Sequence, residues 1–156
     1  MRSGKIFLLT LFVLGVYKSE AQKEEIIDSL VSISYSASGM ISRFNLFITE
    51  NKIVYEIQNS RQEVDVTYER RRNEYNWLSA VEIVSQINLD SLNKIKSTTD
   101  YRSVDGAMYS ILTIVTKSNT YKTKSFDNGF PMKEILPLIA WIDDLINFPL
   151  IISNLH

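Results

Sequence analysis

The sequence predicts an α+β domain in which an antiparallel sheet of about six strands carries its helices on one face. Segments over residues 31–69 alternate apolar and polar side chains with a period of two, as strands with one buried face do. Two later segments repeat apolar residues every three or four positions, as amphipathic helices do. The resulting order, β-β-β-β-α-β-β-α, groups the strands together, which favours an antiparallel sheet over a parallel one.

The first four strands are expected at residues 31–38, 42–48, 53–58 and 64–69. In the first of them Ile33, Tyr35 and Ala37 alternate with serines. Short polar turns separate the four segments, and a meander in which each strand pairs with its predecessor follows the usual preference for short connections.

A helix is expected over about residues 80–88, because Ser79 and Glu82 have the spacing of a capping box. Residues 89–95 are compatible with an extension of this helix. The final helix is expected to begin near residues 132–134, because Pro137 is tolerated only in a first turn, and to end at Pro149.

Two strands are expected between these helices. Residues 107–116 are apolar on both faces, which is typical of a central strand. Residues 120–126 direct Lys122 and Lys124 outward, as edge strands often do. Gly129 then closes a turn that requires a positive φ.

The N-terminus predicts export. Arg2 and Lys5 precede an apolar run over residues 6–16, and small residues end at Ala21, so residues 1–21 are expected to form a cleavable signal peptide. The run is too short to span a membrane, and no membrane anchor is expected after cleavage. An N-terminal arm at 22–30, a single domain at 31–148 and a tail at 149–156 would follow, in the periplasm or outside the cell.

Composition excludes several classes of function. Without residues 1–21 the chain has 14 basic and 17 acidic residues, which argues against nucleic-acid binding. The single histidine, His156, is terminal and unsuited to a catalytic triad. The absence of cysteine excludes thiol nucleophiles and Cys/His zinc sites. We therefore expect no catalytic residues, no metal and no cofactor.

Six residues are candidates for binding. Gly39, Met40 and Ile41 form an apolar tip on a loop of small residues, the kind of segment that meets a partner, although Met40 could instead fold back on the sheet. Tyr75, Trp77 and Tyr101 lie in connecting segments, where aromatic side chains either contact partners or close the end of the core. Trp77, just before the helix cap, favours the second role.

The function these features favour is an exported, non-catalytic binding module that acts through a protein partner of unknown identity. One alternative is a carrier with a small ligand held in a cavity between sheet and helices. A less favoured alternative is a hydrolase, which would need two carboxylates with separated pKa values. The neighbours Asp143 and Asp144 do not face each other on a helix.

The segment Ser36-Ala37-Ser38-Gly39, followed by a strand, and a final helix flanked by proline resemble the emfourin-type metalloprotease inhibitors. The resemblance covers residues 31–148 and extends to small exported bacterial domains of similar layout. It implies inhibitory contacts near residues 39–42. The chain departs from the family in lacking the paired glycines and the phenylalanine expected after the first strand.

Overall fold

The computed structural model describes residues 30–146, except 60, 62–63, 72–73 and 105–106. The predicted signal peptide, most of the arm and the tail therefore lie outside the described residues. Within the described part, strands of one sheet run in the order β4-β3-β2-β1-β5-β6, with β7 also paired to β5. Their bounds are β1 (Leu30–Ser38), β2 (Ser42–Ile48), β3 (Lys52–Asn59), β4 (Val64–Arg71), β5 (Tyr109–Thr116), β6 (Thr120–Lys122) and β7 (Phe126–Asp127).

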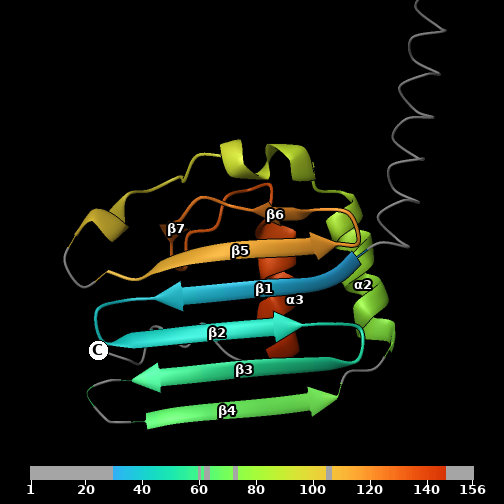
Figure 1. Ribbon diagram of the computed structural model, residues 1–156. Coiled ribbons are helices and arrows are strands. Elements are labelled where there is room, and N and C mark those ends of the chain that lie inside the picture. The colour runs from blue at the N-terminus through green and yellow to red at the C-terminus, as the bar shows by residue number, and fades with distance from the viewer. Residues whose placement is uncertain (1–29, 60, 62–63, 72–73, 105–106, 147–156) are drawn as a thin grey trace, which may run out of the picture.

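The first four strands pair in sequence order and β1 lies at the centre of the sheet (Figure 1). Tyr35 of β1 lies opposite Leu46 of β2 and Leu112 of β5, and the pairs of described strands are antiparallel. The predicted antiparallel meander is confirmed. The central position predicted for residues 107–116 is confirmed as well, because β5 lies between β1 and β6.

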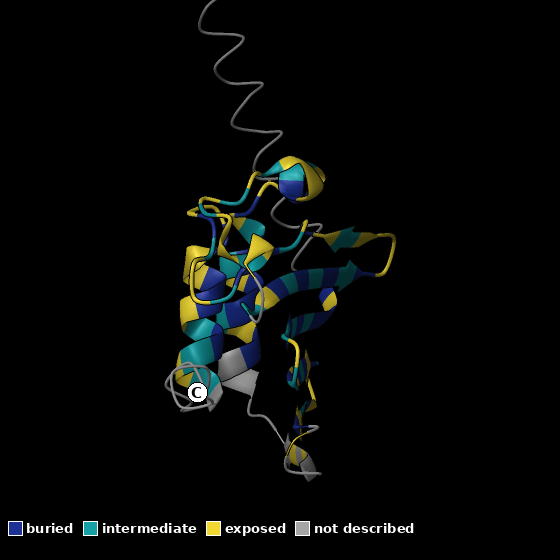
Figure 2. Ribbon diagram, turned by 90° about the vertical axis from the view of Figure 1, so that its left-hand side faces the viewer, coloured by how far each residue is buried: buried dark blue, intermediate teal, exposed yellow. Residues whose placement is uncertain are grey.

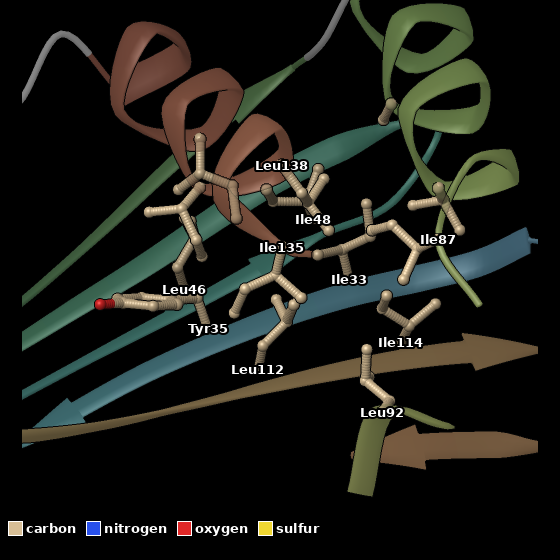
Figure 3. Close-up of a cluster of buried hydrophobic side chains, with 14 of the residues drawn as sticks. Ile33, Tyr35, Leu46, Ile48, Ile87, Leu92, Leu112, Ile114, Ile135 and Leu138 are labelled. Carbon is tan, nitrogen blue, oxygen red and sulfur yellow. The ribbon is translucent and has the colours of Figure 1, made fainter. Parts of the chain in front are cut away.

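Helices α2 (Glu74–Ser85) and α3 (Leu136–Ile146) cover one face of this sheet (Figures 1 and 2). The core lies between sheet and helices, where Ile33, Leu112 and Ile114 of the strands meet Ile135 and Leu138 (Figure 3). The predicted α+β class, with helices on one face, is thus correct. Among the described residues, no helix has the length and apolar character needed to cross a membrane.

The predicted boundaries of α2 are wrong. The helix begins at Glu74, so Ser79 lies inside it and does not cap it. Trp77, Ala80, Val81 and Val84 are all buried and form one stripe at helical spacing, which extends the helix toward its N-terminus. Residues 89–95 do not prolong it, because the chain turns and Leu89–Lys94 forms a separate 3₁₀ helix, η1.

The remaining boundaries differ in smaller ways. Helix α3 begins at Leu136 rather than at residues 132–134, and Pro137 stands in its first turn as predicted. The strand predicted at 120–126 is divided into β6 and β7, because the Thr123 hydroxyl accepts a hydrogen bond from the Leu112 amide at 3.0 Å between them. Lys122 and Lys124 are exposed, as expected.

Candidate functional site

At one end of the sheet, on the left in Figure 1, β1 ends and β2 and β5 begin. The segments at this end carry several exposed apolar side chains. We call this surface the loop end and define it by residues 39–41, 101–104, 109 and 129–130. The exposed side chains there are Met40, Tyr101, Val104, Tyr109 and Phe130. Monomeric proteins rarely leave such a cluster uncovered without a role in contact with another molecule.

The β1–β2 turn presents Met40 to solvent. The Gly39 amide donates to the Ser42 carbonyl at 2.9 Å and closes the turn. The Met40 side chain at its tip is 67% exposed, so it does not fold back on the sheet. An open hollow of about 230 Å³ lies beside it, lined in part by Ile41, Arg43 and Gln58. Met40 and this hollow together offer a projection and a recess to a partner.

Gly39 is required where it stands because Met108 packs against it. A β-carbon at position 39 would lie 2.8 Å from Met108 Cγ, closer than side-chain atoms approach one another. The Ser42 hydroxyl lies 3.8 Å from the Met108 sulfur, on the far side of the same turn. The β1–β2 turn is therefore packed against the segment that enters β5.

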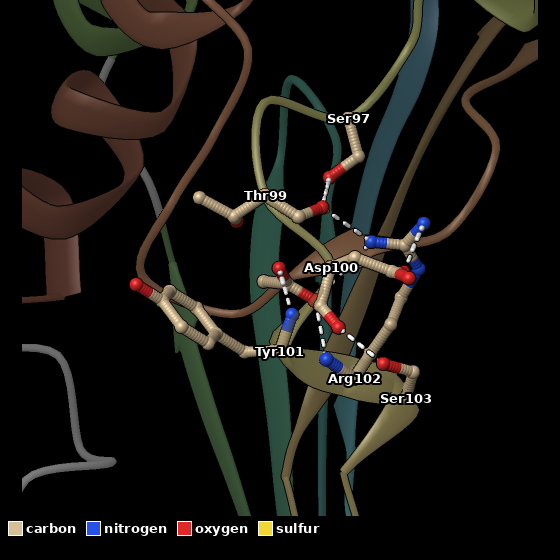
Figure 4. Close-up of polar contacts among 7 residues, drawn as sticks. Ser97, Thr99, Asp100, Tyr101, Arg102 and Ser103 are labelled. Carbon is tan, nitrogen blue, oxygen red and sulfur yellow. Dashed lines mark hydrogen bonds and ion pairs between the residues drawn. The ribbon is translucent and has the colours of Figure 1, made fainter.

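The 3₁₀ helix η2 (Tyr101–Ser103) is held by a buried carboxylate. Asp127 is 1% exposed and accepts hydrogen bonds from the backbone amides of Tyr101 and Arg102, each at 2.7 Å. The Arg102 guanidinium bonds Asp127 at 3.2 Å and the Thr99 carbonyl at 2.8 Å, and it pairs with Asp100 (Figure 4). The free backbone amides at the start of this short helix therefore find their acceptor in a side chain 25 residues away from Arg102.

The net effect on Asp127 is a lowered pKa. Burial by itself would raise the pKa of this carboxyl, but the hydrogen bonds that it accepts from the Arg102 and Tyr101 amides and from the Arg102 guanidinium outweigh it and hold the pKa below its usual value. Asp127 is therefore ionised at neutral pH. Its charge is neutralised within the fold by Arg102, which makes it a structural group.

Asp127 also helps to position an aromatic pair, with its carboxylate bonded to the Tyr101 amide and its main-chain carbonyl bonded to the Phe130 amide. The Phe130 amide donates to the Asp127 carbonyl at 3.0 Å across a turn in which Gly129 has φ +82°, as predicted for that glycine. Tyr101 and Phe130 then lie with ring centroids 5.3 Å apart, and both are exposed. A tilted pair of this kind presents a preformed apolar surface.

Beneath the loop end lies a polar cluster of Tyr35, Ser110 and Asn128. The Tyr35 hydroxyl lies 2.8 Å from Ser110 Oγ and 3.0 Å from Asn128 Oδ1, and Ser110 Oγ donates to Asn128 Oδ1 at 2.7 Å. Burial raises the pKa of Tyr35 to about 12; the hydrogen bond with Ser110 acts against this shift, and the charge of Asp143 adds to it. The phenol is therefore neutral at physiological pH and links β1, β5 and the turn after β7.

This raised pKa predicts a loss of stability at high pH. The native form holds its proton more tightly than the unfolded chain, so the stabilisation is complete below about pH 10 and is lost as the pH rises through about 12. The shift corresponds to about 2–3 kcal/mol. Unfolding free energies measured from about pH 9 to 12 should fall more steeply for the wild type than for Tyr35→Phe. Tyr109→Phe is the matched control for loss of a phenol, and equal slopes for the wild type and Tyr35→Phe would contradict the assignment.

The structure places the six predicted binding residues in different settings. Gly39, Met40 and Ile41 lie in the β1–β2 turn, and Tyr101 lies in η2 at the same end of the sheet, held through Asp127 and the start of β5. Trp77 is only 7% exposed and belongs to the core, so it offers almost no contact surface. Tyr75 stands in α2, and its side chain lies outside the described residues.

Sequence reasoning missed Val104, Tyr109, Phe130 and the role of Asp127. In the sequence Val104 precedes Asp105-Gly106 and Phe130 follows Gly129, and a neighbouring glycine is the local signal that would have marked both as exposed. The hydrogen bonds of Asp127 join segments distant in the chain and leave no local pattern.

Comparisons of the chain with protein-family models, with curated proteins and with solved structures found no match. The residues that the structure describes hold no group of three or more His, Cys, Asp or Glu side chains suited to binding a metal. The functional proposal therefore rests on the geometry of the loop end.

Proposed function

We propose that this chain is an exported, non-catalytic binding module that contacts a partner protein through the loop end. The observation that carries the proposal is that Met40, Tyr101 and Phe130 are exposed on three separate segments at the same end of the sheet. Exposed Met and aromatic side chains at one place are typical of the energetic centre of an interface.

The way these segments are held supports the same function. Asp127 fixes η2 by short hydrogen bonds, and Gly39 allows Met108 to pack under the β1–β2 turn. The Tyr35 cluster ties the turn after β7 to the sheet. A surface ordered before it meets its partner loses less conformational entropy on association. The loop end is thus suited to tight binding without rearrangement.

The packing also favours a binding module over a carrier with a cavity between sheet and helices. In that space the side chains of Leu112, Ile114, Ile135 and Leu138 are fully buried and lie against one another (Figure 3). A secreted metalloprotease is the partner class implied by the resemblance of residues 36–39 to emfourin-type inhibitors, and the turn that carries this resemblance is the one that exposes Met40.

The test is crosslinking followed by affinity capture from the native exported fraction, with the tagged chain as bait. A stoichiometric partner should be captured by the wild type and reduced about tenfold or more by Met40→Asp, because a charge in a desolvated contact costs more than 1.4 kcal/mol. Leu78→Asp is the matched control, since Leu78 is an equally exposed apolar side chain on α2.

The outcomes are distinct. Retention by Leu78→Asp and loss by Met40→Asp would support the loop end as the contact. Equal capture by both variants would exclude Met40 from the interface, and the absence of any partner would contradict the binding module. A captured protease whose activity falls on titration with the wild type would identify the inhibitor case.

A further inference from the structure

A second recess lies away from the Met40 turn, between η1 and the segment that leads into α3. Its volume is about 440 Å³, within the range of about 300–1,000 Å³ that is usual for small-molecule sites. Ile95, which packs partly against the core, provides an apolar floor above the buried Met132. The recess is therefore large enough and apolar enough to hold the hydrocarbon part of a small ligand.

The rim of this recess is cationic. Lys94, Lys96 and Lys133 line it and are exposed, and Glu134 is the acidic residue among the lining side chains. The whole chain has a formal charge of −1, so three lysines around one recess are a local excess of positive charge that the composition as a whole does not show. Lysine can lay its aliphatic stem over an apolar floor and keep its ammonium group in water.

We propose that this recess binds a small amphipathic carboxylate, an apolar chain of moderate length that ends in one carboxylate group. The apolar chain would lie on Ile95, above the buried Met132, and the carboxylate would lie among the ammonium groups of the rim. A neutral apolar molecule would gain nothing from the lysines, and a small inorganic anion would gain nothing from the floor. Lysines act as point charges and do not impose the planar, paired geometry of an arginine fork, so a single mobile carboxylate suits them.

The site does not depend on the protein contact proposed for the loop end. Its lining comes from η1 and from residues 94–98 and 132–134, whereas the loop end is built from the β1–β2 turn, η2 and the turn after β7. Loss of one function therefore leaves the other testable.

The test is a titration of the purified protein with octanoate, followed by backbone amide NMR. Octanoate should shift the amides of Ile95, Lys96 and Met132 and should bind about tenfold more tightly than either 1-octanol or acetate, because each of these two lacks one of the two contacts.

Lys94→Gln combined with Lys133→Gln should weaken octanoate binding about tenfold. Lys52→Gln combined with Lys117→Gln removes the same charge elsewhere on the surface and should leave binding unchanged. Higher salt should weaken binding to the wild type.

A variant of the floor separates the two halves of the proposal. Ile95→Asn should weaken binding of octanoate and leave the weaker binding of acetate as it was. Octanoate binding that survives the Lys94→Gln, Lys133→Gln pair, or amide shifts that map away from the recess, would overturn the site. Binding of a hexaglutamate peptide without binding of octanoate would also overturn it and would assign the recess to an acidic protein segment.

Discussion

Replacement of Asp127 by alanine is expected to lower the free energy of unfolding by roughly 3–5 kcal/mol, because two backbone amides lose their acceptor at about 1–3 kcal/mol each and one charge-assisted bond is lost as well. The substitution removes the acceptor of two backbone amides, those of Tyr101 and Arg102, and the partner of the Arg102 guanidinium. Thermal and urea unfolding followed by circular dichroism measure the change. Asp100→Ala is the control, because Asp100 pairs with the same guanidinium from an exposed position and should cost less than about 1 kcal/mol.

The contribution of Asp127 also depends on pH. Its pKa is depressed in the native state, so its stabilising effect is present above the unfolded pKa of about 4 and is lost as the pH falls through the lower native pKa. The wild type should therefore lose stability below about pH 4 more steeply than Asp127→Ala does. Equal destabilisation by Asp127→Ala and Asp100→Ala would show that η2 is held by other contacts.

If Asp127→Ala remains folded but captures less of the partner protein, the Asp127 carboxylate is connected to binding. The Tyr101 amide donates to the Asp127 carboxylate, and the Tyr101 ring lies beside Phe130, so loss of the carboxylate should displace one member of this aromatic pair. The bond from the Phe130 amide goes to the Asp127 main-chain carbonyl and is kept in the variant. Asp127→Ala should therefore weaken partner capture even at temperatures at which the variant remains folded. The Met40→Asp variant reports the same contact from a different segment.

The sheet could be predicted because its signal is local. The alternation of Ile33, Tyr35 and Ala37 with serines shows in the sequence itself that β1 has one buried face. The short turns between the first four strands leave few ways in which these strands can pair. The start of α2 was missed because a capping box is a short motif, whereas the buried stripe from Trp77 to Val84 depends on what the helix packs against. Tertiary packing decided where this helix begins.

The candidate site could be predicted only in part. Met40 and Tyr101 stand out in the sequence as large side chains in polar or small-residue loops, and both are exposed. The arrangement that brings Tyr101 beside Phe130 depends on Asp127, which is 26 residues from Tyr101 and looks in the sequence like an ordinary turn residue. Contacts of this range follow from the sheet topology, and no periodicity in the sequence reports them.

Replacement of Leu138 by alanine is the second large effect, and its matched control stands two residues away on the same helix. Leu138 is fully buried and lies beside Ile135 and Ile48 in the core (Figure 3), whereas Leu136 is 51% exposed. Leu138→Ala removes buried methyl and methylene groups and leaves a cavity, so it should cost about 3–5 kcal/mol. Leu136→Ala should change stability by less than about 0.5 kcal/mol.

Chemical denaturation measures both variants, and an unchanged m-value would show that each difference is one of stability. A cost of this size is a large fraction of the roughly 5–15 kcal/mol that stabilises a typical domain, so Leu138→Ala should be close to unfolding at elevated temperature. Equal costs for the two leucines would mean that α3 does not present its Leu138 face to the sheet. The contrast between them therefore tests the placement of α3, and with it the packing that closes the core beneath the Tyr35 cluster and the loop end.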